Sequence, residues 1–234
     1  MMPALAPSIA GTPIAVTQAS PSALLAVQAL SCRRGLRAVF DDVAFDLGAG
    51  DALVLTGPNG SGKSSLLRVL AGLTRPSAGD VKWSGVSVRD DEEAHHRRLA
   101  YLGHAEAVKP ALSVAENLDF WVALSDGGGS ATTRDAALRH FGLLSLARLP
   151  ARYLSAGQRR RLSLARVVAV PRGLWLLDEP SVGLDAGAQA ALLAAIAAHR
   201  SAGGIALVST HAALALPGAR VLDLARFAPR ESRA

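Results

Sequence analysis

The segment GPNGSGKS, residues 57 to 64, could hold the phosphates of a nucleotide. It satisfies the pattern G-x-x-x-x-G-K-[ST], in which glycines let the backbone turn tightly and point N–H groups at phosphate oxygens. The lysine of this pattern can reach the β- and γ-phosphates, and the serine after it can hold Mg²⁺ through its hydroxyl. The predicted nucleotide-binding residues are Gly57, Pro58, Asn59, Gly60, Ser61, Gly62, Lys63, Ser64 and Ser65.

A chance glycine-rich turn is the alternative, and the segments on either side argue against it. ALVLT, residues 52 to 56, is a nearly continuous apolar run, as expected for a parallel strand buried on both faces. SSLLRVLAGL, residues 64 to 73, changes to helical spacing, so that the positive end of a helix dipole would face the loop. Strand, loop and helix together predict a phosphate-binding loop.

Two adjacent carboxylates, Asp178 and Glu179, end a second apolar run, GLWLLDEP. We expect Asp178 to bind Mg²⁺ together with Ser64, and Glu179 to act on the attacking water as general base. A helix-capping acidic cluster is the alternative for such a pair. The SVGLD segment that follows, with Asp185, favours the chemical interpretation.

Two further segments decide the class of nucleotide-binding protein. LSAGQ precedes a helical pattern and, taken alone, could be only a serine N-cap. IALVSTH is another apolar strand, which ends in His211. In this order the segments resemble the motifs of ATP-binding cassette (ABC) ATPases, over about residues 25 to 215. The signature residues under this resemblance are Leu154, Ser155, Ala156, Gly157 and Gln158.

The resemblance to ABC ATPases implies a mechanism and a fold. Two copies would face each other, so that the signature of one contacts the γ-phosphate held by the other, with Asp185 relaying across the interface. Glu179 and His211 would be the catalytic residues, with ATP and Mg²⁺ bound. The implied fold is α/β, a P-loop NTPase with a RecA-like core, a small antiparallel β subdomain and a helical subdomain. The expected divisions are a disordered tail at 1–22, the ATPase domain at 23–228 with its helical subdomain at about 108–165, and a tail at 229–234.

His104 departs from the pattern of the ABC family, where a glutamine at this position touches Mg²⁺ and the attacking water. It could be a surface residue, a functional substitute for glutamine, or the mark of a subfamily. YLGHAEAVKPALSVAENLDFW, residues 101 to 121, resembles the LGH…K…LT…ENL segment of the cytochrome c maturation ATPases, the CcmA family. That resemblance favours the third interpretation.

Membership of the CcmA family would imply ATP hydrolysis coupled to haem export or to release of a haem-loaded chaperone. The implied partners are a second copy of the chain and membrane permease subunits like CcmB and CcmC, at the cytoplasmic face of the bacterial inner membrane. We expect no direct haem binding, because the sequence has no Cys-x-x-Cys-His motif. The alternatives are the ATPase of another small exporter, for lipids, drugs or peptides, and a non-transport ABC ATPase acting on nucleic acid.

Composition is consistent with a peripheral cytosolic protein. The net charge of +6 would suit nucleic acid, acidic lipids or a membrane partner, but aromatic residues are only 4% of the chain, too few for base stacking, so we expect no nucleic acid partner. One cysteine, Cys32, excludes an internal disulfide. No apolar run approaches the roughly 18 residues that span a bilayer. The first 23 residues lack Lys and Arg, unlike a secretory signal.

Three arginine-containing segments have other predicted roles. HHRR (95 to 98) and RRR (159 to 161) are predicted to be solvated helix surface, or an interface in the second case. Arg161 and Arg166 coincide with arginines usual in the ABC family. The aromatic residue that stacks on adenine in many cassettes would fall in SCRRGLRAVF (31 to 40), where Arg34 is the candidate instead.

The remaining elements follow from periodicity and turn residues. Besides those named above, we expect strands near 25–31 and 43–47, a hairpin in 75–88, helices within 108–160 interrupted by a loop at 125–133, a helix at about 186–202, and a last strand in 219–227.

Overall fold

The computed structural model describes residues 23–125, 130–211 and 214–229, so the expected tail at 1–22 and all but the first residue of the expected tail at 229–234 lie outside the described residues. In chain order the elements are β1 (Leu25–Arg34), β2 (Arg37–Leu47), β3 (Ala52–Thr56), α1 (Lys63–Leu70), β4 (Ala78–Trp83), β5 (Val86–Ser87), α2 (Glu92–Arg98), β6 (Leu99–Leu102), α3 (Val114–Ala123), α4 (Ala131–His140), α5 (Ala156–Ala169), β7 (Leu174–Asp178), α6 (Ala186–Ser201), β8 (Ile205–Ser209) and β9 (Arg220–Asp223). Short 3₁₀ turns lie at Leu144–Leu146, Ala151–Tyr153 and Leu224–Phe227.

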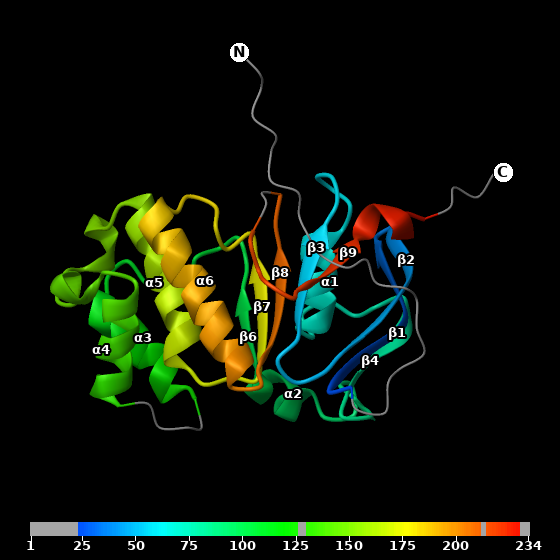
Figure 1. Ribbon diagram of the computed structural model, residues 1–234, viewed down its shortest axis with the longest axis horizontal. Helices are drawn as coiled ribbons and strands as arrows, with labels where there is room; N and C mark the ends of the chain where they lie inside the picture. Colours follow the sequence, from blue (N-terminus) through cyan, green and yellow to red (C-terminus); the bar gives the residue numbers. More distant parts are fainter. Residues whose placement is uncertain (1–22, 126–129, 212–213, 230–234) are drawn as a thin grey trace, which may run out of the picture.

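The strands form two sheets, which stand side by side in Figure 1. One has five parallel strands in the order β6-β7-β8-β3-β9, and the other has four antiparallel strands in the order β2-β1-β4-β5. This confirms the predicted α/β class, with a parallel core and a small antiparallel sheet. The carboxyl ends of β3, β6, β7 and β8 meet at one edge of the parallel sheet, which is where such sheets bind ligands.

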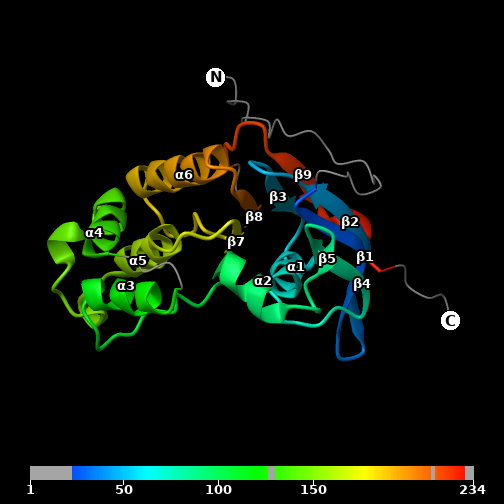
Figure 2. The same ribbon diagram turned by 90° about the horizontal axis from the view of Figure 1, so that it is seen from below.

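The parallel sheet is buried on both faces, as its continuous apolar strands predict. In β7, Leu174 and Leu176 pack into the core shared with α1 and the antiparallel sheet, whereas Trp175 and Leu177 pack toward the helices on the opposite face. Figure 2 shows α1 on one side of the parallel strands and α6 on the other. The strand ends are therefore held by two cores at once.

The antiparallel sheet begins with a hairpin that is longer than the sequence suggested. β1 continues to Arg34 and β2 starts at Arg37, because a two-residue turn, Gly35-Leu36, joins them directly. Gly35 takes a positive φ of 59°, which the tight turn requires and glycine allows at no steric cost. Arg34 and Arg37 are consequently paired across the hairpin.

The helical part consists of α3, α4 and α5, which pack against one another beside the parallel sheet (Figure 1). The loop predicted at 125–133 is wrong at its end, since α4 already starts at Ala131. Ser130 caps this helix by accepting a hydrogen bond from the N–H of Thr133, a signal that the polar composition concealed. Residues 126–129 of the same loop lie outside the described residues.

The predicted solvated surface for the HHRR segment is wrong for one of its histidines. His95 is only 1% exposed, and its Nε2 lies 2.7 Å from the carbonyl oxygen of Leu70, at the end of α1. Because α2 packs this side against α1, the ring satisfies a helix-terminal carbonyl that would otherwise be buried without a partner. His96 and Arg97 are exposed.

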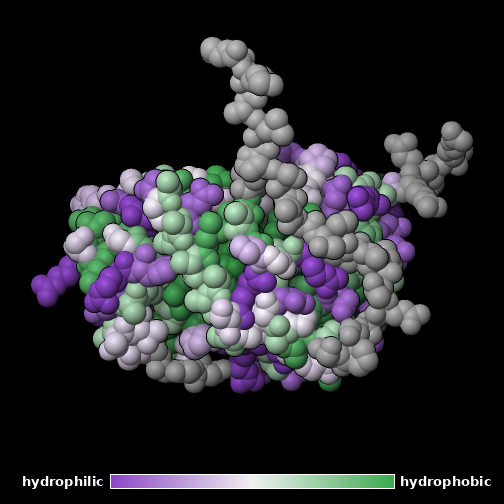
Figure 3. Space-filling model, in the orientation of Figure 1, coloured by the Kyte–Doolittle hydropathy of each residue, from purple (hydrophilic) through white to green (hydrophobic). Residues whose placement is uncertain are grey.

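The outer surface is mixed in polarity. On the face shown in Figure 3, apolar residues gather over the alanine-rich α6, with polar residues over much of the rest. Among the described residues, no helix combines the length and the apolar character that crossing a membrane would need.

Candidate nucleotide-binding and hydrolytic site

The phosphate-binding loop has the backbone that its glycines predict. Gly57, Gly60 and Gly62 have φ values of 127°, 81° and 103°. A Cβ at Gly62 would lie 2.8 Å from Val39 Cγ1, and one at Gly57 would lie 2.8 Å from Ser61 Oγ. Only glycine fits at these two positions, both for its φ and for the lack of space.

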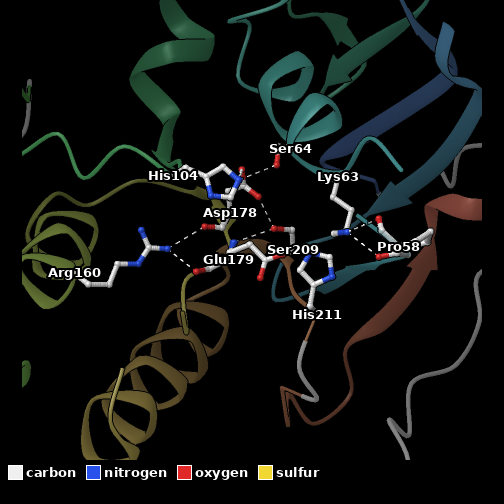
Figure 4. A network of polar contacts seen from close by, with 10 residues as sticks. Pro58, Lys63, Ser64, His104, Arg160, Asp178, Glu179, Ser209 and His211 are labelled. Carbon is white, nitrogen blue, oxygen red and sulfur yellow. Dashed lines mark hydrogen bonds and ion pairs between the residues drawn. The ribbon is translucent and has the colours of Figure 1, made fainter. Parts of the chain in front are cut away.

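Lys63 begins α1 and is 6% exposed. Its Nζ donates hydrogen bonds to the carbonyl oxygens of Gly57, at 2.8 Å, and Pro58, at 3.1 Å (Figure 4). Burial lowers the pKa of this ammonium, and the carboxylates of Glu179 and Asp178 oppose that shift. The charge thus lies within the loop, where phosphate oxygens would compete for the same protons.

Asp178 is the last residue of β7 and is 1% exposed. Its Oδ1 accepts a hydrogen bond of 2.6 Å from the hydroxyl of Ser209, which ends the neighbouring strand β8. The same hydroxyl oxygen accepts the backbone N–H of Glu179 at 2.9 Å. Ser209 therefore fixes the orientation of the Asp178 carboxylate, and sequence analysis missed it. The signal was its place at the end of the next parallel strand.

Glu179 lies one residue beyond β7 and has a positive φ of 49°, which is uncommon for a residue with a side chain. It is 7% exposed, and its Oε1 lies 2.9 Å from Nε2 of His211. Strained backbone that surrounding contacts maintain is often found at functional sites. The structure thus brings together the two residues that the sequence predicts to be catalytic.

Arg160 corrects the prediction for the RRR segment. It is 7% exposed, not solvated, and it donates hydrogen bonds to the carbonyl oxygens of Asp178 (3.1 Å), Glu179 (2.6 Å) and Gly103 (3.3 Å). Burial lowers the pKa of its guanidinium, and the carboxylates of Glu106, Asp178 and Glu179 oppose this. The sequence did carry a signal, because Arg160 precedes the buried Leu164 by four residues and so shares its helix face.

The flanking arginines are more accessible. Arg159 pairs with Glu106 at 3.1 Å, and Arg161 donates to the carbonyl oxygen of Phe141. Arg166, further along α5, donates to the carbonyl oxygen of Tyr101, and burial lowers its pKa to about 10.

His104 follows β6 and lies beside the strand-end carboxylate (Figure 4). Its Nε2 is 3.3 Å from Ser64 Oγ and 3.3 Å from Asp178 Oδ2. That Oδ2 is buried and accepts no hydrogen bond, although His104 is near. A hydroxyl and a buried carboxylate oxygen without a hydrogen bond form a donor set that suits Mg²⁺, so the residues present fit this ion.

The signature segment is at the N-terminus of α5. Ser155 is the N-cap and forms a reciprocal capping box with Gln158, at 3.2 Å from Gln158 N to Ser155 Oγ and 2.8 Å from Ser155 N to Gln158 Oε1. The simpler alternative, a serine N-cap, therefore describes its local structure. Leu154 is buried, whereas Ser155 and Ala156 are exposed. Asp185 likewise caps α6, accepting the N–H of Ala188 at 2.7 Å.

One groove of about 860 Å³ collects most of the predicted site. The sequence-predicted residues that line it are Asn59, Gly60, Gly62, Lys63, Ser64, Ser65, His104, Ala156, Gly157, Glu179 and His211. Gly57, Pro58, Ser61, Leu154, Ser155, Gln158, Asp178 and Asp185 do not line it; Asp178 is buried directly beneath.

Arg34, the candidate for a base contact, lines the same groove together with Arg37 and Val39. Among its described lining residues there is no Phe, Tyr or Trp. The two arginines lie opposite each other on the hairpin, next to the phosphate-binding loop.

The chain is similar to known proteins over most of its length. Residues 40–182 match the model of the ABC transporter family. The chain is 54% identical to the "Cytochrome c biogenesis ATP-binding export protein CcmA" of Paramagnetospirillum magneticum, over 86% of this chain and 94% of that protein. It is 52% identical to the protein of the same name from Rhodospirillum rubrum, over 91% of this chain and 90% of that one.

A solved structure described as the ATP binding subunit of an ABC transporter is similar with a TM-score of 0.73 and 27% identity, over 80% of this chain and 79% of that one. The family model and the high identity over nearly full lengths agree with the site geometry. The alternative exporters for lipids, drugs or peptides are thereby less well supported than the haem-related family. The chain belongs to the ATP-binding cassette ATPases, which bind and hydrolyse ATP, and within them to the CcmA family of cytochrome c biogenesis.

Proposed function

We propose that this chain is the ATP-hydrolysing subunit of an ABC complex for c-type cytochrome biogenesis, acting as a haem-transporting ATPase. One observation carries the hydrolytic part of the proposal. Lys63, Glu179 and His211, from three separate elements, face one groove at the edge of the parallel sheet. None of the separate motifs requires these three side chains to lie close together, whereas ATP hydrolysis requires all of them around one phosphate.

The residues divide the work according to their positions. Lys63 binds the β- and γ-phosphates, and the N–H groups of the glycine-rich loop surround them. Ser64 and Asp178 hold Mg²⁺, which when bound neutralises negative charge on the phosphates. Glu179 takes a proton from the attacking water. The water oxygen then bonds to the γ-phosphorus as the bond between that phosphorus and ADP breaks. His211, at 2.9 Å from Glu179, positions that carboxylate and the water.

The signature requires a second copy of the chain. Ser155 and Ala156 are exposed, and the start of α5 presents free N–H groups with the positive end of a 14-residue helix. Such an end suits a γ-phosphate held by a partner copy. We therefore propose a head-to-tail homodimer with two composite sites, in which Asp185 contacts the opposite copy.

The biological role follows from the relatives. Their name describes ATP-binding export proteins of cytochrome c biogenesis. We propose that hydrolysis is coupled to haem export, or to release of a haem-loaded chaperone, through membrane permease subunits like CcmB and CcmC. The chain would lie at the cytoplasmic face of the bacterial inner membrane and bind neither haem nor nucleic acid itself.

Glu179→Gln tests the hydrolytic assignment. We expect ATP hydrolysis to fall by about 10²- to 10⁴-fold, because the proton acceptor is lost, while ATP binding persists and a dimer accumulates. Turnover and sedimentation in ATP and Mg²⁺ measure both. The control is Glu93→Gln on α2, whose carboxylate is 80% exposed and should not affect turnover. Unchanged turnover in Glu179→Gln would refute the base assignment.

Purification from native membranes tests the biological role. We expect the intact chain to copurify with a multi-spanning subunit of the cytochrome c maturation system. Recovery with an unrelated permease instead would support another exporter and contradict the proposed role in cytochrome c biogenesis.

A further inference from the structure

The metal-binding corner of the site contains a nitrogen atom. Ser64 Oγ and Asp178 Oδ2 are oxygen donors, and the Nε2 of His104 lies 3.3 Å from each of them. Figure 4 shows the imidazole ring between the start of α1 and the end of β7, with its Nε2 turned toward both oxygens. Among the described residues that line the groove, His104 and His211 are the two with imidazole rings, and His211 is paired with Glu179 instead.

These distances fit direct coordination. Two donors at right angles around an octahedral ion, each about 2.0 to 2.1 Å from it, lie about 2.9 Å apart. The separations of 3.3 Å on both sides of His104 need to shorten by only a few tenths of an ångström. The His104 side chain is 68% exposed, so its ring can make that adjustment without disturbing a packed core.

The surrounding hydrogen bonds leave the required lone pairs available. Ser209 occupies Oδ1 of Asp178, so Oδ2 is the carboxylate oxygen directed toward His104 and the metal. A ring that binds through Nε2 carries its proton on Nδ1, which faces away from the carboxylate. Ser64 Oγ can donate its own hydrogen elsewhere while its oxygen binds the ion.

We propose that His104 is a ligand of the nucleotide-bound metal and that it shifts the preference of this site from Mg²⁺ toward imidazole-binding divalent ions such as Co²⁺ and Ni²⁺. The proposal rests on the proposed function, because it uses the same Ser64 and Asp178 oxygens. Mg²⁺ is bound by oxygen donors, whereas an imidazole nitrogen favours borderline transition metals. A glutamine at residue 104 would supply an oxygen and remove this bias.

The test compares the full chain with His104→Gln in the binding of ADP, measured by calorimetry in Mg²⁺ or in Co²⁺. We expect the ratio of ADP affinities, Co²⁺ over Mg²⁺, to be at least about tenfold higher in the native chain, since one nitrogen ligand is exchanged for oxygen. Thermal unfolding checks that the variant is folded. His96→Gln, which removes an exposed imidazole remote from the groove, is the matched control and should leave the ratio unchanged.

A spectroscopic measurement makes the assignment independent of affinity. With Mn²⁺·ADP and ¹⁵N-histidine labelling, electron spin echo spectra of the native chain should show a directly bound nitrogen, and those of His104→Gln should not. An unchanged affinity ratio would overturn the preference, and absence of nitrogen coupling in the native chain would overturn the ligand assignment. If ADP bound with none of these ions, the proposed nucleotide site itself would fail, a result distinct from either of those.

Discussion

The two ends of this nucleotide site are built differently. At the strand-end region, Lys63, Asp178 and Glu179 are each less than 10% exposed. Hydrogen bonds with the carbonyl oxygen of Pro58, the hydroxyl of Ser209 and the guanidinium of Arg160 hold them. At the start of α5, Ser155 and Ala156 are exposed, and their hydrogen bonds stay within the first turn of the helix. The first region is organised by the whole fold, and the second by four consecutive residues.

This difference shows which part of the chemistry one chain completes. Buried charges at the strand ends are arranged before any ligand arrives, because moving them would disrupt two cores. An exposed helix N-terminus offers donors but no enclosing surface. The comparison therefore predicts that damage to the strand-end region affects folding and hydrolysis together, whereas damage to α5 can affect hydrolysis alone.

Arg160→Ala should give the largest effect on stability. It leaves the carbonyl oxygens of Asp178, Glu179 and Gly103 without their charged donor, and we expect the free energy of unfolding to fall by about 3 kcal/mol. Denaturant titration measures this, and ATP hydrolysis should fall in parallel. Arg159→Ala is the matched control: its partly exposed pair with Glu106 should contribute about 1 kcal/mol or less. Equal losses in the two variants would break the distinction between the regions.

Ser155→Ala addresses the other region. Loss of the N-cap should lower the free energy of unfolding by about 1 kcal/mol. ATP hydrolysis should fall roughly tenfold or more, because the start of α5 would no longer be held in position to contact the γ-phosphate. Ser130→Ala removes the equivalent cap of α4, away from the groove. It should cost similar stability and leave turnover intact. A parallel loss of turnover in Ser130→Ala would show that stability alone explains the effect.

His95→Gln should have the smallest effect and sharpens the comparison through pH. Burial lowers the pKa of His95 below its ordinary value of 6.5, so the unfolded chain binds a proton that the folded chain does not. Stability is therefore retained above pH 6.5 and lost as the pH falls below it, with a slope of at most about 1.4 kcal/mol per pH unit for one group. The variant should flatten this slope, whereas His96→Gln should not.

Burial also lowers the pKa of His199, so this residue contributes to the same loss of stability at acid pH. It is present in both variants. The measurement is denaturant unfolding at several pH values between 5.5 and 7.5. An unchanged slope in His95→Gln would mean that the His95 ring does not govern the loss of stability at acid pH.

Sequence predicted the parts of the site that lie within continuous motifs. The glycine-rich loop, the Asp178–Glu179 pair, the cap at Ser155 and the strand before His211 are local, so their spacing carries the information. Arg160 and Ser209 could not be recognised so directly, because their roles depend on partners 18 to 57 residues away in sequence. The expected solvation of HHRR failed for the same reason, since α1 covers His95 through tertiary packing alone.

Fold prediction shows the same limit. The buried strands and the parallel sheet follow from apolar runs. The start of α4 depends instead on the single capping residue Ser130, and the length of the first hairpin depends on the Gly35-Leu36 turn. The average composition of a segment does not reveal such single positions. The roles of the individual site residues are predictions that the variants above test.

The left-handed backbone of Glu179 has a cost that every other part of the chain must cover. A residue with a side chain is disfavoured in this conformation by roughly 1 to 2 kcal/mol. That is a sizeable share of the free energy of unfolding of a typical native protein, about 5 to 15 kcal/mol. The backbone conformation that places the Glu179 carboxylate in the site therefore also lowers the stability of the chain. Lineages adapting to heat would have to recover that free energy elsewhere, because relaxing this backbone would move the carboxylate that we propose as the general base.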